Sequence, residues 1–360
     1  KNNSDGKGNS YGCHENYLMA RSAPFGRIVA HATAHLITRQ LFTGSGKVGT
    51  EVPGLSSVEV PYQLTQRADF FEAEVGLETT LKRPIINTRD EPHADAQKYR
   101  RLHVITGDAN CSEVATLLKV GTTALVLCLV EDEALPRTFA FRAPVAAMRE
   151  VSHDLTLRRP LELDDGTTVT ALEVQWELLA RARAWAEAEG LDAVGGAEVG
   201  ELVLREWEAV LTDLEVDPMR ARDRVDWVAK QHLLQAYQDR HGVGWDDPRV
   251  AAMALQYHDL RPHRSLADRV GLRRLTSAEE VARAMTEPPS DTRAYFRGRC
   301  LQRWSSDIVA ANWDSIVFDI GQSTLRRVPM MEPLRGTRSH VGTVVDESAD
   351  PAELLARLSG

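Results

Sequence analysis

The chain has 360 residues, of which 43% are hydrophobic and 26% charged, which is typical of a globular protein with one large domain or two. A formal net charge of −9 argues against a protein whose main task is to bind nucleic acid. The four cysteines include no CxxC pair, and no apolar run approaches the roughly 20 residues that span a bilayer, so we expect a cytoplasmic protein without disulfides or a membrane anchor.

The polar opening run KNNSDGKGNS leads directly into the dense motif SYGCHENYLMAR (10–21). If this motif is an extended strand, His14 and Asn16 share one face, and Glu15 and Tyr17 share the other. A face that carries an imidazole beside a carboxamide is a poor hydrophobic core but a reasonable ligand platform. The opening run is either a flexible tail or, as we favour, the point at which a longer protein has been cut.

The next segments contain two motifs that suggest chemistry but fail its requirements. Apolar residues at helical spacing predict a helix over 26–42, in which His31 and His35 lie one turn apart. A zinc protease motif needs Glu at the second position, where Ala32 stands, so we favour ordinary buried or surface histidines. The run TGSGKVG (43–49) lacks the Walker spacing and is predicted to be a mobile surface loop.

The segment YRRLHVI (99–105) is predicted to be a strand with Arg101, His103 and Ile105 on one face. The planar guanidinium suits a polyphosphate, and a neutral imidazole can ligate a divalent metal. Placed beside the first motif, this strand would complete a floor for a metal–nucleotide complex. The alternative is that these side chains are merely solvated on an exposed sheet face.

The remainder of the chain is predicted to be mostly helical. We expect a long apolar helix capped by Ser112, helices across 144–284, a hairpin turn at Asp165–Gly166, a strand within 308–320 and a closing helix from 351. The change of character after the Pro-Pro pair suggests two domains, a large one over 1–303 and a small one over 304–360.

Long segments resemble a known family, in the right order and over nearly the whole chain. NNSDGKGNSYGCHENYLM, RPIINTRDEPHADAQKYRRLHVITGDAN, LKVGTTALVL and VSHDLTLRRP are similar to the family of Pup ligases and Pup deamidase/depupylases. PPSDTRAYFRGRCL, NWDSIVFDIG and RVPMMEPLRGTRSHVG resemble its deamidase/depupylase (Dop) branch. The resemblance implies an α+β fold, with a glutamine-synthetase-like curved antiparallel sheet packed with helices and a small C-terminal α/β domain.

The resemblance also implies a reaction and a site. Members of this branch hydrolyse the C-terminal carboxamide of Pup, converting Gln to Glu, and the Pup–lysine isopeptide bond, with Mg-ATP as a bound cofactor. Carried onto this sequence, His14 and His103 are expected to bind Mg²⁺, and Asn16, Arg101 and Trp313 to contact ATP. The expected partners are Pup and pupylated proteins, and the expected oligomeric state is a monomer.

Two family segments are not found in this sequence. The family pattern begins with a Gly-x-Glu-x-Glu strand and then a segment that carries the nucleophilic Asp. We therefore expect the catalytic nucleophile in a missing N-terminal part, and this chain alone to be inactive. Three alternatives stay open: a Pup–protein ligase that consumes ATP, a non-catalytic Pup- or nucleotide-binding fragment, and another carboxylate–amine ligase of glutamine-synthetase type.

Overall fold

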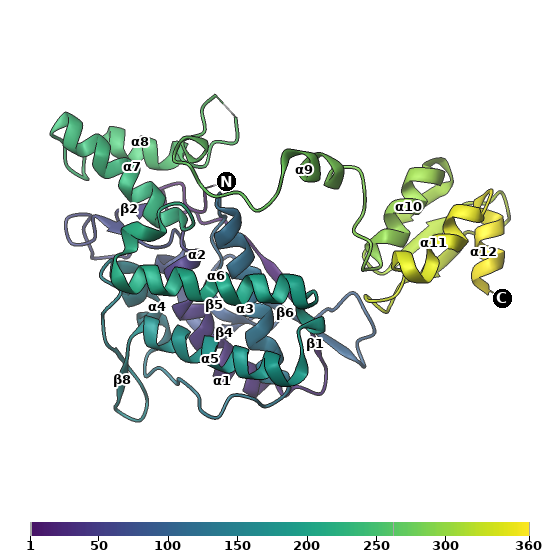
Figure 1. Ribbon diagram of the computed structural model, residues 1–360, viewed down its shortest axis with the longest axis horizontal. Coiled ribbons are helices and arrows are strands. Elements are labelled where there is room, and N and C mark those ends of the chain that lie inside the picture. The colour runs from purple at the N-terminus through teal and green to yellow at the C-terminus, as the bar shows by residue number, and fades with distance from the viewer. Residues whose placement is uncertain (1, 262, 360) are drawn as a thin grey trace. The chain divides into compact units, whose positions relative to one another are not determined.

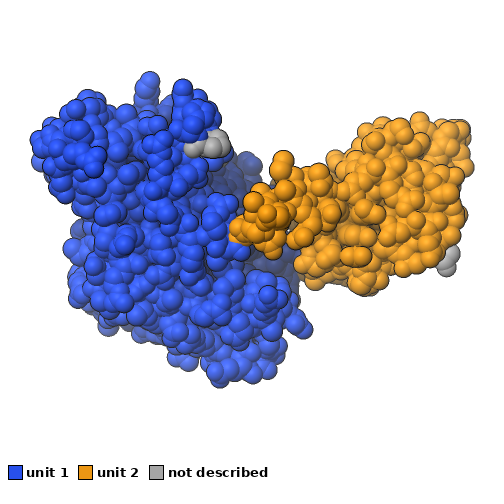
Figure 2. Space-filling view, turned by 45° about the horizontal axis from the view of Figure 1, so that its top comes forward, with its two compact units in different colours: residues 1–90, 101–275 blue, residues 91–100, 276–360 orange. Residues whose placement is uncertain are grey.

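The computed structural model describes residues 2–261 and 263–359 and divides the chain into two compact units (Figures 1 and 2). The first unit comprises Lys1–Asp90 and Arg101–Leu275, and the second comprises Glu91–Arg100 and Thr276–Gly360. The boundary expected after residue 303 falls inside the second unit, in the last turn of helix α10. A short segment from the middle of the sequence thus belongs with the C-terminal unit, which local sequence patterns do not indicate.

The first unit is built mainly from helices. They are α1 (Phe25–Thr38), α2 (Gln40–Thr43), α3 (Glu113–Glu131), α4 (Pro144–His153), α5 (Ala171–Glu189), α6 (Ala197–Val216), α7 (Asp226–His241) and α8 (Pro248–Gln256). Its strands are short: β1 (Glu15–Ala20), β2 (Lys47–Val48), β3 (Tyr62–Gln63), β4 (Phe71–Gly76), β5 (Arg83–Asn87), β7 (Leu161–Glu162) and β8 (Thr168–Val169), together with most of β6 (Tyr99–Val104).

The strands of this unit form separate pairs. β1 pairs with β6, β2 pairs antiparallel with β3, and β7 pairs antiparallel with β8. The β7–β8 hairpin turns at Gly166, whose φ of 81° a glycine adopts without strain, as the Asp-Gly sequence predicts. β4 and β5 run parallel, so this pair differs from the expected antiparallel sheet. The mixture of helices and strands agrees with the α+β class.

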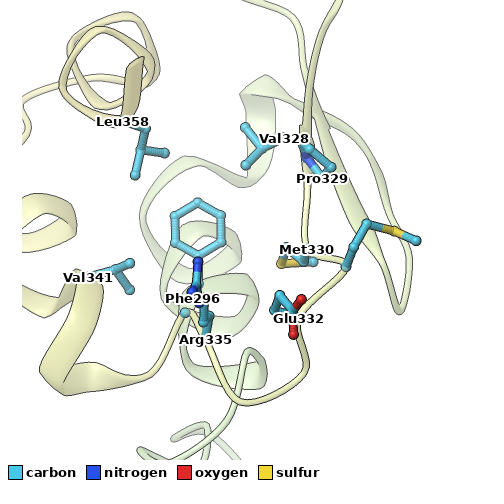
Figure 3. A pocket seen from close by; sticks show the side chains of 10 residues that line it. Phe296, Val328, Pro329, Met330, Glu332, Arg335, Val341 and Leu358 are labelled. Atoms are coloured by element: carbon cyan, nitrogen blue, oxygen red, sulfur yellow. The ribbon is translucent and has the colours of Figure 1, made fainter. Parts of the chain in front are cut away.

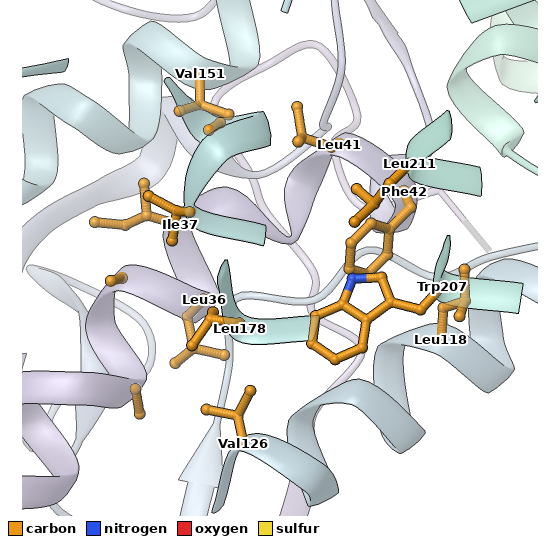
Figure 4. Close-up of a cluster of buried hydrophobic side chains, with 14 of the residues drawn as sticks. Leu36, Ile37, Leu41, Phe42, Leu118, Val126, Val151, Leu178, Trp207 and Leu211 are labelled. Carbon is orange, nitrogen blue, oxygen red and sulfur yellow. The ribbon is translucent and has the colours of Figure 1, made fainter. Parts of the chain in front are cut away.

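The core of the first unit lies between α1, α3, α5 and α6 (Figures 1 and 4). Trp207 of α6 is fully buried there, with its ring 6.4 Å from that of Phe42, and Leu36, Leu118 and Leu178 belong to the same buried cluster. These helices come from distant parts of the sequence. Helix α1 follows β1 in the chain and helix α3 follows β6, so the packing of α1 against α3 supports the two strands that carry the candidate site.

Helix α3 is long and apolar enough to cross a membrane by length and composition, with a mean hydropathy of 1.8, which corrects the expectation that no run approaches that length. Buried residues make up 61% of that apolar stretch, and α3 packs against α1, α5 and α6. The helix begins where the sequence predicts, because the Ser112 side chain accepts a hydrogen bond from the Ala115 amide. Its apolar length is explained by its place in the core.

Gly121 of α3 allows α6 to approach closely. A Cβ at this position would lie 2.4 Å from Cγ2 of Val203, so Gly121→Ala is expected to destabilise the protein by about 1–3 kcal/mol despite the better helix propensity of alanine. Urea unfolding checks this result. Gly26→Ala in α1 is the matched control, since no described atom lies within 4 Å of its Cβ, and it should raise stability slightly. Equal effects of the two changes would contradict the packing argument.

The second unit has its own small core. Its antiparallel sheet has the order β11 (Arg326–Pro329), β10 (Ser315–Phe318), β9 (Ile308–Ala311), and its helices are α9 (Ala278–Ala284), α10 (Ala294–Trp304), α11 (Arg338–Glu347) and α12 (Pro351–Ser359). The single strand expected within 308–320 is a hairpin, because the chain turns between Ala311 and Ser315. The expected closing helix is confirmed as α12.

Candidate active site

The candidate site is built on the paired strands β1 and β6, which the sequence predicts to lie side by side. Along β1, Glu15, Tyr17 and Met19 are buried, whereas Asn16 and Leu18 are exposed, so the predicted alternation of faces is confirmed. The buried residues of β1 pack toward the core below. The opposite side of the strand therefore presents polar groups where a ligand can reach them.

His14, Asn16 and His103 come together on this pair of strands. The imidazole rings of His14 and His103 have centroids 5.1 Å apart and are nearly perpendicular. Nδ1 of His103 lies 2.8 Å from the carboxamide Oδ1 of Asn16. An amide oxygen only accepts hydrogen bonds, so this contact assigns a proton to Nδ1 of His103. A histidine held in one tautomer by such a bond is the usual arrangement for a metal ligand.

Gly12 makes room for the first of these rings. A Cβ at Gly12 would lie 2.5 Å from Cδ2 and 2.6 Å from Nε2 of His14, closer than any side chain tolerates. The glycine in the motif GCHEN is therefore required by the position of the imidazole.

Arg101 lies half-buried on β6, and its backbone amide donates a 3.1 Å hydrogen bond to Asp90. Asp90 also forms an ion pair with Arg21 at 2.5 Å, which ties the start of this strand to the end of β1. Ile105, expected on the same face as Arg101, is instead fully buried in the core, because the strand ends at Val104.

Trp313 belongs to the second unit, where its side chain is 64% exposed and lies 5.1 Å from the guanidinium of Arg297. The second unit also contains an apolar cavity of about 350 Å³, lined by residues that include Phe296, Met330 and Val341 (Figure 3). Trp313 does not line this cavity, and its role as a nucleotide contact stays a prediction.

A buried ion pair underlies the polar face. The guanidinium of Arg39, at the end of α1, makes two parallel hydrogen bonds to the Glu15 carboxylate, at 2.6 and 2.8 Å. The Tyr17 hydroxyl donates a third hydrogen bond to this carboxylate at 2.5 Å. The sequence pattern places Glu15 on the inner face of the strand, but it does not identify Arg39 as its partner.

Arg67 lies beside the candidate site, and sequence reasoning did not identify it. It is 1% exposed, and only its Nη1 has a hydrogen bond, to Ser10 Oγ at 3.1 Å; within the described residues, Nε and Nη2 have no acceptor. Its Cζ lies 3.2 Å from where a Gly12 Cβ would be, which places it beside the His14 segment. Burial lowers the pKa of Arg67 to about 10, so it is a cation at neutral pH. Two unsatisfied donors on a buried cation point to an anionic ligand.

The loop at 43–49 is buried and fixed, so the expectation of a mobile surface loop is wrong. Asp108 accepts hydrogen bonds from the amide and the hydroxyl of Ser45, at 2.9 and 3.1 Å. The buried ammonium of Lys230 donates to the Gly46 carbonyl at 2.8 Å. These partners lie 63 and 184 residues away, which is why the local sequence suggests only a glycine-rich loop.

The opening run is also tied to the unit. Asn3 is fully buried, its carbonyl accepts from the Tyr11 amide at 2.8 Å, and its side chain accepts from the Ala109 amide at 2.7 Å. Residues 2–10 are therefore a fixed loop beside the start of β1. This loop holds the His14 motif at its N-terminal side.

The other histidine pair, His31 and His35, lies on α1. His35 is fully buried in α1, with Nε2 3.0 Å from the Thr123 hydroxyl, as the ordinary interpretation predicts. Over residues 2–261 and 263–359, no group of three His, Cys, Asp or Glu side chains is arranged to hold a metal ion. His14 and His103 therefore supply at most part of a metal site.

Comparison with known proteins identifies the family of this chain. The family model described as "Pup-ligase protein" matches residues 1–317. A protein named depupylase from Acidothermus cellulolyticus is 52% identical over 368 residues, covering 100% of this chain and 72% of that protein. A Pup deamidase/depupylase from Mycolicibacterium smegmatis is 47% identical, covering 100% and 71%. A Pup–protein ligase from Nakamurella multipartita is 42% identical, covering 96% and 75%.

Two solved structures are similar to the whole chain. The Pup ligase PafA in complex with ADP matches with a TM-score of 0.84 at 36% identity, covering 96% of this chain and 76% of that one. The complex between Pup and PafA matches with a TM-score of 0.85 at 36% identity, covering 100% and 73%.

Proposed function

Since this chain belongs to the Pup-ligase protein family, we propose that it acts as an amide hydrolase on Pup, deamidating a C-terminal Gln and cleaving the Pup–lysine isopeptide bond. The observation that carries the choice of hydrolase is the 52% identity to a depupylase over the entire chain, compared with 40–46% for Pup–protein ligases. The C-terminal segments that resemble the deamidase branch support the same choice. The proposed partners are Pup and pupylated proteins, and the proposed location is the cytoplasm, as a monomer.

The proposed cofactor is Mg-ATP, bound over β1 and β6. His14 and His103 would offer imidazole nitrogens to Mg²⁺, while Asn16, Arg101 and Trp313 would contact the nucleotide. Arg67 joins this set, because its two unsatisfied donors suit a phosphate oxygen. Support for a nucleotide comes from the related ligase whose structure contains ADP.

These residues fit the cofactor only in part. Mg²⁺ prefers oxygen ligands, and the described residues offer no carboxylate cluster at the two imidazoles. We propose that the carboxylate ligands and the nucleophilic Asp are supplied from outside these 360 residues, so that the chain alone is inactive. The related depupylases are longer, since this chain covers 71–72% of them.

Hydrolysis of an amide requires fixed positive charge near the amide carbonyl, which is a poor electrophile. An amide carbonyl becomes reactive when charge that develops on its oxygen is stabilised, and a bound metal–nucleotide would supply that stabilisation. This chain's residues would hold the nucleotide in place: Arg67 and Arg101 as cations toward phosphate, and Asn16 by fixing the ring of His103. The nucleotide is then a retained cofactor, and hydrolysis of the amide needs no stoichiometric ATP consumption.

The direct test compares the full-length protein with this 360-residue chain alone. Incubated with Mg-ATP and Pup ending in Gln, the full-length protein is expected to release one ammonia per Pup, and the chain alone none. ATP consumption in step with conjugation of Pup ending in Glu would identify a ligase instead. Nucleotide binding with neither reaction would identify a binding protein.

A further inference from the structure

We propose that the buried Glu15–Arg39 ion pair is a positioning device that sets the spacing between His14 and His103. The proposal rests on the proposed function only for the role of the two imidazoles. It assigns to Glu15 and Arg39 no contact with substrate or cofactor.

The geometry shows how one guanidinium reaches both strands. Nη2 of Arg39 donates to Glu15 Oε1 at 2.6 Å and to the Thr106 hydroxyl at 3.2 Å. Glu15 is the first residue of β1 and follows His14 directly, whereas Thr106 lies three residues after His103, just beyond the end of β6. Arg39 therefore bridges the two chain segments that carry the two imidazoles.

The guanidinium is fixed from a third direction by helix α3. Nη1 of Arg39 donates to the Thr123 hydroxyl at 2.8 Å and to the Lys119 carbonyl at 3.2 Å. The Arg39 side chain is 1% exposed and that of Glu15 is 6% exposed, so water does not compete for these bonds. The planar guanidinium is therefore held in one orientation, and its hydrogen bonds hold Glu15 and Thr106 at fixed positions relative to each other.

Gly107 leaves room for the carboxylate of Glu15. A Cβ at Gly107 would lie 2.6 Å from Glu15 Oε1 and 3.1 Å from the Cys13 carbonyl. The Gly107 carbonyl in turn accepts from the Cys13 amide at 3.1 Å. The chain after β6 thus closes over the residue that precedes His14, in direct contact with the buried pair.

Stability alone does not account for this arrangement. A buried ion pair is often no more stabilising than well-packed apolar residues of the same volume, although loss of one partner is costly. A two-stranded pair is also marginal by itself, so its geometry depends on what lies beneath it. Arg39 supplies that support with five hydrogen bonds, to Glu15, Thr106, Thr123 and Lys119.

The experiment separates position from stability with two variants of the full-length protein. Glu15→Gln leaves Arg39 buried with reduced pairing and should lower the melting temperature. The double variant Glu15→Met/Arg39→Met should recover most of that loss through apolar packing. Both variants are nevertheless expected to bind Mg-ATP about 10- to 100-fold more weakly by calorimetry, the range found when outer partners of metal ligands are lost.

A second readout does not need the cofactor. With ¹³C-labelled histidine, the ring protons of His14 and His103 should show a nuclear Overhauser contact in the parent protein, which both variants should lose. Asp213→Leu/Arg224→Met removes another largely buried ion pair, with side chains 16% and 12% exposed, and should leave the contact and the affinity unchanged.

The outcomes distinguish this proposal from the proposed function. If the parent protein shows the ring contact but binds no Mg-ATP, the proposed function fails. The positioning role is then tested by the ring contact alone: loss of this contact in both variants supports the role, and its retention contradicts it. If the double variant regains stability and keeps both the ring contact and the Mg-ATP affinity, the positioning role is overturned.

Discussion

His103→Ala in the full-length protein is expected to abolish release of ammonia from Pup ending in Gln and to weaken Mg-ATP binding. The ring is buried, with its Nδ1 held by Asn16 at 2.8 Å and its neighbour His14 5.1 Å away, so no other described imidazole can take its place without moving a strand. The loss in affinity should exceed the roughly 10- to 100-fold cost of losing an outer partner of a ligand. Calorimetric titration with Mg-ATP and an ammonia assay measure the two effects.

His31→Ala is the matched control, since His31 lies half-buried on α1, outside the paired strands. It should leave affinity and activity near those of the parent. Asn16→Ala gives an intermediate case, because His103 is retained but its tautomer is no longer fixed. Mg-ATP binding should therefore weaken less in this variant than in His103→Ala. Parent-like activity of the His103 variant would remove this histidine from the site.

The sequence allowed the polar face of this site to be predicted because strand geometry is local. Alternation at 14–18 follows from the two-residue period alone, and the structure confirms it in the burial of Glu15 and Tyr17. The same rule gave the wrong environment for Ile105, because it contains no information about where a strand ends. β6 stops at Val104, and the next side chain enters the core.

Residues whose role depends on distant partners were not predictable in this way. Ser45 and Gly46 have the composition of a surface loop, yet they are buried and hydrogen-bonded to partners far away in the sequence, such as Asp108 and Lys230. Arg39 lies in an ordinary helical pattern, yet it ends beneath β1. Residues 91–100 join the second compact unit in the same way, through contacts with distant residues such as the hydrogen bond from the Asp95 amide to the Met331 carbonyl.

Arg67→Met is expected to separate ligand affinity from stability. In the ligand-free protein, the change removes two buried donors that lack acceptors, while the thioether keeps most of the apolar contact with Phe71, over whose ring the guanidinium lies at 5.7 Å. Asp108 loses a nearby cation, but it keeps hydrogen bonds from the Gln66 and Ser45 amides. The free energy of unfolding should therefore change by less than about 1 kcal/mol.

Nucleotide affinity should respond quite differently to the same change. Loss of a buried cation that meets an anion typically costs about 2–5 kcal/mol, so Mg-ATP should bind at least about 30-fold more weakly in calorimetry. Arg149→Met is the contrasting control: its guanidinium donates to the Phe71 carbonyl at 2.7 Å, so its loss should lower stability and leave affinity intact. A variant at 67 that is strongly destabilised yet binds Mg-ATP normally would show that Arg67 is structural. The ligand-binding role requires the opposite result, because the unsatisfied donors of Arg67 would form their hydrogen bonds with the ligand and not within the fold.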